Sequence, residues 1–128
     1  MVKSRTKGVV VKVECRYLES HSDPAKQSFF FVYFITIIND SDKSIQLLKR
    51  RWNIFDSLSE PRIVEGEGVV GETPVLHPGE EFQYNSGCNL MSEFGYMEGY
   101  YMFQDLNDES FFDVEIPRFL LVSPAKLN

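Results

Sequence analysis

Three glycines in the middle of the chain, Gly66, Gly68 and Gly71, follow the spacing G-x-G-x-x-G. In dinucleotide-binding proteins this spacing marks a tight turn between a strand and a helix, where free N–H groups and the helix N-terminus hold a pyrophosphate. No helix is expected here, because Pro74 and Pro78 follow closely and the residues between them favour a strand. We therefore expect no NAD or ATP site of the Rossmann type.

The charge around these glycines also disfavours a phosphate ligand. Glu65, Glu67 and Glu72 interleave with them, and each carboxylate near a phosphate costs on the order of 1 kcal/mol even in water. Two interpretations are open. The glycines permit positive φ or close backbone approach in an irregular connection between sheets, or their N–H groups form a nest that holds a small anion without a helix.

A run of three basic residues at positions 49–51 is the only cationic cluster expected inside the fold. Its middle member, Arg50, shares parity with Leu48 and Trp52, so we expect it to be partly buried. Arg50 then either lays its stem along the core and pairs with a carboxylate or flanks Trp52, or it offers its guanidinium fork to an anion at the glycine loop. An anion site would consist of Arg50, Gly66, Gly68 and Gly71.

Other polar residues do not show the spacing that metal binding or catalysis requires. His21 and Asp23 share a predicted loop, but a closed transition-metal site usually has three or four ligands. Ser86 lies in YNSG, outside the strand-turn-helix elbow of serine hydrolases. Glu80 and Glu81 point to opposite faces of a strand and form no pair. We expect no enzymatic activity, no cofactor and no metal site built from these residues.

The elements that would position these residues are predicted to be strands. Apolar and polar residues alternate from Gly8 to Tyr17, which predicts a half-buried strand. Residues 29–38 are apolar on both parities, which predicts a strand covered on both faces. In residues 44–55 the apolar positions change phase, which indicates either a β-bulge or a strand that passes from the edge to the centre of a sheet. Shorter strands are expected at Arg62–Val64, Glu81–Tyr84, Met97–Phe103, Phe111–Ile116 and Phe119–Val122.

Many short strands joined by turns, with negligible helix, predict an all-β fold of the antiparallel immunoglobulin or fibronectin type III-like β-sandwich kind. Trp52 is expected at the middle of its core. With 128 residues, 43% of them hydrophobic, the chain has room for a single domain with a real core. We expect that domain to span residues 1–128, with its core at about 9–122 and short flexible termini.

The charge and the hydrophobic pattern of the chain limit the classes of partner that we expect. A formal charge of −6 repels phosphate backbones, so nucleic acid is not expected to bind. No apolar run approaches the roughly 20 residues of a membrane span, and the start MVKSRTKG lacks the apolar middle of a secretory signal. We therefore expect a cytoplasmic protein with no membrane contact. Cys15 and Cys88 are too few for a disulfide framework and are expected to be reduced, buried thiols.

Aromatic residues exceed what one core face can hold: the relevant residues are Tyr84 and, in the segment GYMEGYYMF, Tyr96, Tyr100, Tyr101 and Phe103. Some of them must point outward, and exposed aromatic side chains are the anchors that protein interfaces favour. Tyr100 and Tyr101 are therefore the interface candidates. The partner would be a protein of unknown identity or a second copy of the chain in a symmetric homodimer.

Four segments together resemble the ApaG family: LLKRRW, VEGEGVVGETPVLHPGEEFQYNSG, GYMEGYY and FDVEIPRFLL. Within these segments the motifs G-x-G-V-V-G, P-G-E-x-F-x-Y-x-S-G and I-P-x-F follow one another in the order typical of the family. The resemblance extends from about Val9 to Val122. The resemblance implies a fibronectin type III-like sandwich and an association with cobalt and magnesium ion homeostasis. It also implies a role in protein-protein contacts, as for related domains in eukaryotic proteins. A further implication is that the glycine motif could be a pyrophosphate or nucleotide site.

The function expected from these observations is a non-enzymatic protein-protein interaction module of the ApaG type, linked to cobalt and magnesium homeostasis. The alternative is a protein that binds a small anion, such as pyrophosphate or a nucleotide, or a divalent metal at the G-x-G-x-x-G loop.

Overall fold

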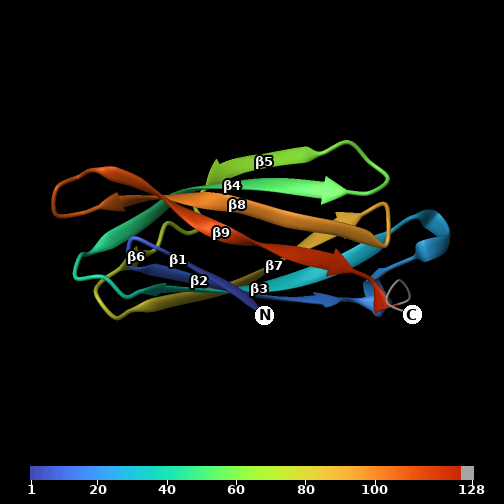
Figure 1. The fold of residues 1–128 in the computed structure, drawn as a ribbon, viewed down its shortest axis with the longest axis horizontal. Coiled ribbons are helices and arrows are strands. Elements are labelled where there is room, and N and C mark those ends of the chain that lie inside the picture. The colour runs from blue at the N-terminus through green and yellow to red at the C-terminus, as the bar shows by residue number, and fades with distance from the viewer. Residues whose placement is uncertain (125–128) are drawn as a thin grey trace.

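The computed structural model describes residues 1–124, which form two antiparallel β-sheets packed face to face (Figure 1). This confirms the predicted all-β antiparallel sandwich. Two single turns of 3-10 helix lie between the second and third strands, and residues 1–124 include no helix with the length and apolar character that crossing a membrane would take. In chain order the elements are β1 (Val2–Thr6), β2 (Val9–Tyr17), η1 (Glu19–His21), η2 (Pro24–Lys26), β3 (Phe29–Asn39), β4 (Ile45–Asp56), β5 (Arg62–Glu67), β6 (Val75–Leu76), β7 (Glu81–Leu90), β8 (Phe94–Asp105) and β9 (Phe111–Val122).

One sheet has the strand order β1-β2-β3-β7, and the other has the order β5-β4-β8-β9, with β6 paired to the beginning of β4. The edges β1 and β9 are joined through hydroxyl groups. Ser4 Oγ donates to the carbonyl of Glu115 at 2.9 Å, and the Glu115 N–H donates to Thr6 Oγ1 at 3.2 Å. On the opposite side Arg62 of β5 donates through Nη2 to the carbonyl of Asn89 in β7 at 3.0 Å. These side-chain bonds tie the two sheets together at edges where no backbone ladder connects them.

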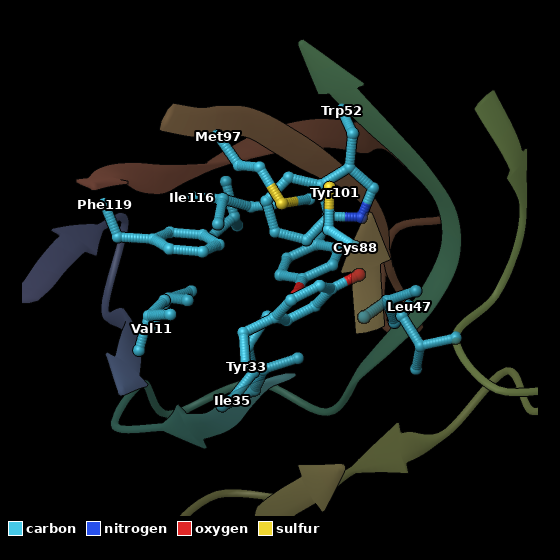
Figure 2. Close-up of a cluster of buried hydrophobic side chains, with 14 of the residues drawn as sticks. Val11, Tyr33, Ile35, Leu47, Trp52, Cys88, Met97, Tyr101, Ile116 and Phe119 are labelled. Atoms are coloured by element: carbon cyan, nitrogen blue, oxygen red, sulfur yellow. The ribbon is translucent and has the colours of Figure 1, made fainter. Parts of the chain in front are cut away.

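The core lies between the sheets because alternate residues of each strand point inward (Figure 2). Trp52 is at its middle, as predicted, and packs edge-on against Tyr33 and Phe119 with ring centroids 5.3 and 5.8 Å apart. Such edge-to-face contacts between aromatic rings add stabilisation beyond the apolar area they bury. The aromatic centre therefore fixes how the two sheets face each other.

Two bulges interrupt the ladders of the second sheet. Of the two explanations for the phase change in β4, the β-bulge is confirmed, since the register shifts between Leu47 and Lys49 and leaves Leu48 as the extra residue. A second shift brings Met97 opposite Phe119 but Gly99 opposite Ile116, so β9 carries the extra residue there. That region of β9 contains a proline, which cannot donate to the ladder. The two strands predicted at 111–116 and 119–122 are consequently one bulged strand.

Two expectations about the first sheet are wrong. Strand β3 is not covered on both faces: Phe31, Tyr33 and Ile35 are buried, whereas Phe34 on the other face is exposed and lies under the Arg16 guanidinium. The start of the chain is not a flexible terminus, because β1 pairs along its whole length with β2. The flexible end expected at the other terminus includes residues 125–128, which lie outside the described residues.

Candidate functional site

The glycine segment forms the end of β5 and a tight turn. Gly66 pairs with Arg50 of β4, and the N–H of Gly68 donates to the carbonyl of Leu48 at 2.8 Å. The chain then reverses between Val69 and Glu72, which exchange two backbone hydrogen bonds of 2.8 and 2.9 Å. The two residues between them have positive φ values of 43° and 81°, which is the combination of a type I′ turn.

This geometry differs from that of a dinucleotide-binding turn. In the described chain the segment after the turn leads through Thr73 and Pro74 into the short strand β6, and no helix starts there. The N–H groups of Gly68, Val69 and Glu72 already donate to carbonyl groups of the protein. A nest built on this turn would therefore have only the remaining N–H groups to offer an anion.

Arg50 faces the glycine segment and binds its backbone. Nη1 donates to the carbonyl groups of Glu67 and Gly68, both at 2.9 Å. The planar guanidinium lies against Gly66, where a Cβ atom would be 2.8 Å from Nη1 and 2.9 Å from Nη2. Within residues 1–124, Nε and Nη2 of Arg50 donate no hydrogen bond. Arg50 thus fastens the turn to β4 and retains donor capacity.

Behind Arg50, three tyrosines from β3, β7 and β8 meet inside the sandwich: Tyr33, Tyr84 and Tyr101. The hydroxyl groups of Tyr84 and Tyr101 share a hydrogen bond of 2.6 Å. Burial raises the pKa of both phenols above their ordinary value, and the positive charge of Arg50 opposes that rise only in part. The tyrosines are therefore neutral at physiological pH and act as hydrogen-bonding core residues.

Of the two interface candidates, only Tyr100 has an exposed ring. Its side chain is 37% exposed on the outer face of β8, whereas Tyr101 is 0% exposed. Tyr101 as an interface residue is thus a wrong expectation, because neighbouring residues of a strand point to opposite faces and position 101 shares the inward parity of Met97 and Phe103.

The structure brings Tyr100 close to the glycine segment. Tyr100 lies opposite Arg51 of β4 on one side and Glu115 of β9 on the other. Together with Arg50 and Gly66 it lines a shallow hollow of about 450 Å³ on the outer face of the second sheet. Arg50 and Gly66 are thus close to Tyr100, but the guanidinium of Arg50 has the inward parity of Trp52, whereas the ring of Tyr100 points outward.

The remaining candidates do not assemble into a cluster. His21 contacts the hydroxyl of Ser20 at 3.0 Å and lies over Phe30, with ring centroids 5.8 Å apart. In the part of the chain that the structure describes, no three His, Cys, Asp or Glu side chains are grouped so as to hold a metal ion.

One residue that sequence reasoning missed is Asp56, the last residue of β4, which is only 2% exposed. Its carboxylate accepts hydrogen bonds from the Met91 N–H at 2.6 Å, the Ser92 hydroxyl at 2.7 Å and the Leu58 N–H at 3.2 Å. The sequence contained an indication that Asp56 is buried, because Asp56 continues the inward parity of Trp52 and Ile54. An acidic residue at an inward position needs such partners.

The fold and the arginine-bound glycine turn define a small antiparallel β-sandwich protein. The chain belongs to the ApaG domain family, whose model matches residues 19–105. It is 44% identical over 124 residues to Protein ApaG of Methylorubrum extorquens (strain PA1), a match that covers 97% of this chain and 95% of the relative. Protein ApaG of Brucella anthropi is also 44% identical, over 126 residues, with 98% and 96% covered.

A solved structure gives the same result. The crystal structure of the putative ApaA protein from Bordetella pertussis superimposes with a TM-score of 0.88 at 38% identity, covering 94% of this chain and 97% of that one. The resemblance inferred from the motifs is thereby confirmed. The names of these relatives state no enzymatic activity.

Proposed function

We propose that this protein is a non-enzymatic protein-protein interaction module, and that its link to cobalt and magnesium homeostasis runs through a protein partner. The observation that carries the proposal is the exposed ring of Tyr100, which stands on a central strand beside a shallow hollow. Charged residues, Arg51 and Glu115, flank it on the neighbouring strands. An aromatic anchor with a charged rim has the composition of an interaction hot spot.

The proposal assigns no catalytic residue and no cofactor, and it places the protein in the cytoplasm. A metal-linked phenotype is then indirect, since the interaction module acts on a partner instead of carrying the ion. The partner itself has to be identified by experiment.

Affinity capture from an extract of the native cell tests this proposal, with wild-type protein, Tyr100→Ala and Phe111→Ala as baits. Phe111 is the matched control because it is an aromatic residue, 60% exposed, on the same face of the sheet. We expect one protein to be retained by the wild type and by Phe111→Ala, and its recovery to fall roughly tenfold or more with Tyr100→Ala. Equal recovery with all three baits, or no specific protein at all, contradicts the proposal. Light scattering on the free protein shows whether a homodimer uses the same surface.

The second candidate function is binding of a small anion by Arg50 and the glycine segment. The unused Nε and Nη2 donors of Arg50 favour it. Lys49 and Arg51 line the hollow on the outer face, whereas the side chain of Arg50 shares the inward parity of Trp52. Glu65 and Glu67 line that hollow too and oppose anion binding. Calorimetric titration with pyrophosphate tests this second candidate. Saturable binding that disappears in Arg50→Ala supports it, and the absence of binding heat in the wild type excludes it. Titration with cobalt(II) in the same instrument tests the divalent-metal variant.

A further inference from the structure

The loops at one end of the sandwich surround an apolar hollow. The β4–β5 loop, the β7–β8 loop and the β2–β3 connection with η2 lie at this end (Figure 1). They enclose a hollow of about 460 Å³ lined by Phe29, Leu58, Met91 and Phe94, among others. Leu58 is 61% exposed and Met91 is 46% exposed. Two large, exposed apolar side chains therefore line a hollow that also contains Phe29 and Phe94.

Leu58 and Met91 are held on a fixed frame. Asp56 accepts hydrogen bonds from the backbone N–H groups of both residues, at 3.2 and 2.6 Å. The hydroxyl of Ser57 donates to Ser92 Oγ at 2.7 Å, and Ser92 in turn donates to Asp56 at 2.7 Å. Both loops are thus tied to one buried carboxylate. Because the backbone of both loops is already held in place, a partner that covers them orders little further backbone, which favours binding.

The loops at this end of the sandwich carry more acidic than basic residues, and Glu93 lines the hollow itself. Glu19, Asp23 and Glu60 are exposed on the loops of this end, and none of the three takes part in a salt bridge within residues 1–124. Lys26 of the β2–β3 connection and Arg62 at the start of β5 are basic residues at the same end, fewer than the acidic ones. The net negative charge selects among occupants. A second copy would bring the same carboxylates to a symmetric contact, and an anionic membrane or nucleic acid would be repelled as well.

We propose that this end of the sandwich, called here the Leu58–Met91 surface, binds a segment of a partner protein in which a large apolar side chain is flanked by Lys or Arg. The apolar side chain enters the hollow between Leu58 and Met91, where the flexible thioether of Met91 adapts to its shape. The flanking basic residues face Asp23 and Glu60. This inference rests on the proposed interaction function, but it assigns a surface separate from that of Tyr100.

Selection of random dodecapeptides displayed on phage, with the full chain immobilised, tests the Leu58–Met91 surface even while the partner is unidentified. We expect the enriched peptides to combine an apolar residue with neighbouring Lys or Arg. The best peptide is then synthesised and titrated by calorimetry against the wild type, Leu58→Ser/Met91→Ser, Asp23→Lys/Glu60→Lys and Leu120→Ser. Leu120 is the matched control, an exposed leucine on the outer face of β9.

Both double variants should weaken peptide binding roughly tenfold or more, whereas Leu120→Ser should bind like the wild type. Raised salt should weaken binding to the wild type and have little effect on Asp23→Lys/Glu60→Lys. The inference is overturned if no peptide is enriched, if the enriched peptides lack basic residues, or if they bind Leu58→Ser/Met91→Ser as tightly as the wild type. If that happens while Tyr100→Ala still abolishes partner capture, this surface is excluded and the proposed function stands.

Discussion

Gly66 and Arg50 face each other across β5 and β4, and the guanidinium of Arg50 fills the space that a side chain at position 66 would need. The fit explains a glycine inside a strand, where glycine is otherwise unfavourable. It also explains how one arginine reaches the carbonyl groups of Glu67 and Gly68 at 2.9 Å. The first glycine of the motif is therefore matched to a side chain of the protein itself.

We expect Gly66→Ala to destabilise the protein by about 1–2 kcal/mol, because the added methyl group displaces the guanidinium from its two carbonyl partners. In the Arg50→Ala background the same change should cost nothing or stabilise slightly, since alanine suits a strand better than glycine does. A double-mutant cycle in urea measures this coupling. Additive effects of the two substitutions would show that the contact between Arg50 and Gly66 does not contribute to stability.

Gly68 and Gly71 both have positive φ, but only Gly68 is crowded. A Cβ atom at Gly68 would lie 2.1 Å from the carbonyl oxygen of Glu72, whereas none of the structure comes within 4 Å of one at Gly71. Gly71→Ala should therefore cost about 1 kcal/mol for its backbone conformation. Gly68→Ala should cost about 3 kcal/mol or more, because backbone atoms must move. Urea denaturation of the two variants compares them directly, and equal costs would contradict the crowding at Gly68.

Features that depend on the local alternation of apolar and polar residues could be predicted from the sequence. Alternation in residues 8–17 predicted β2, and the phase change in residues 44–55 indicated a bulge as one of two explanations, because both follow from which face each side chain takes. The structure places that bulge at Leu48. Strand β1 was not predictable in this way. Val2 is its one apolar residue, and the strand is held by pairing with β2 and by hydroxyl bonds to Glu115, which is distant in the sequence.

The candidate site was less predictable because it depends on register between strands. The sequence allowed Arg50 to face either a carboxylate, Trp52 or the glycine loop, and only the pairing of β4 with β5 brings it to the carbonyl groups of 67 and 68. Similarly, both parities of β8 carry aromatic residues. Which of Tyr100 and Tyr101 is buried was decided by the sheet that packs against β8, and that information is not local.

The opposite environments of these two tyrosines lead to a matched prediction. Tyr101→Phe removes the partner of the Tyr84 hydroxyl, whose hydrogen bond is 2.6 Å long, and should cost about 1–2 kcal/mol of unfolding free energy. Tyr100→Phe removes a hydroxyl from an exposed ring and should stay within about 0.5 kcal/mol of the wild type. Thermal and urea denaturation provide the measurement. A larger loss for Tyr100→Phe than for Tyr101→Phe would reverse the assignment of the two faces.

Cys15 should react slowly in the folded protein. Burial raises the pKa of its thiol to about 12, with a further contribution from the nearby Cys88. Because the thiolate is the reactive form and Cys15 is partly buried, a disulfide reagent at pH 8 should modify it far more slowly than an ordinary exposed thiol. Burial raises the pKa of Cys88 too, although Arg62 opposes the rise. Both thiols should react at once in urea, and rapid labelling of Cys15 under native conditions would contradict its raised pKa.

Asp56 gives a prediction whose sign depends on pH. Burial alone would raise the pKa of its carboxyl group, but hydrogen bonds from the Met91 N–H, the Ser92 hydroxyl and the Leu58 N–H outweigh burial and bring the pKa below the ordinary 3.8. A group whose pKa is lower in the folded state stabilises the fold when it is ionised. This contribution is fully present above the pKa of the unfolded chain, and it is lost as the pH falls toward the folded pKa.

Asp56→Asn should therefore be less stable than the wild type by about 1–3 kcal/mol at pH 7, since an amide presents a donor to groups that themselves donate. The difference between the two proteins should narrow as the pH is lowered from about 5 to about 3, because the wild type loses its ionised carboxylate there. Urea denaturation at a series of pH values measures it, with Asp113→Asn, an exposed position, as the control that stays near the wild type throughout. A difference that does not change with pH would show that Asp56 stabilises the two loops through shape and not through its charge.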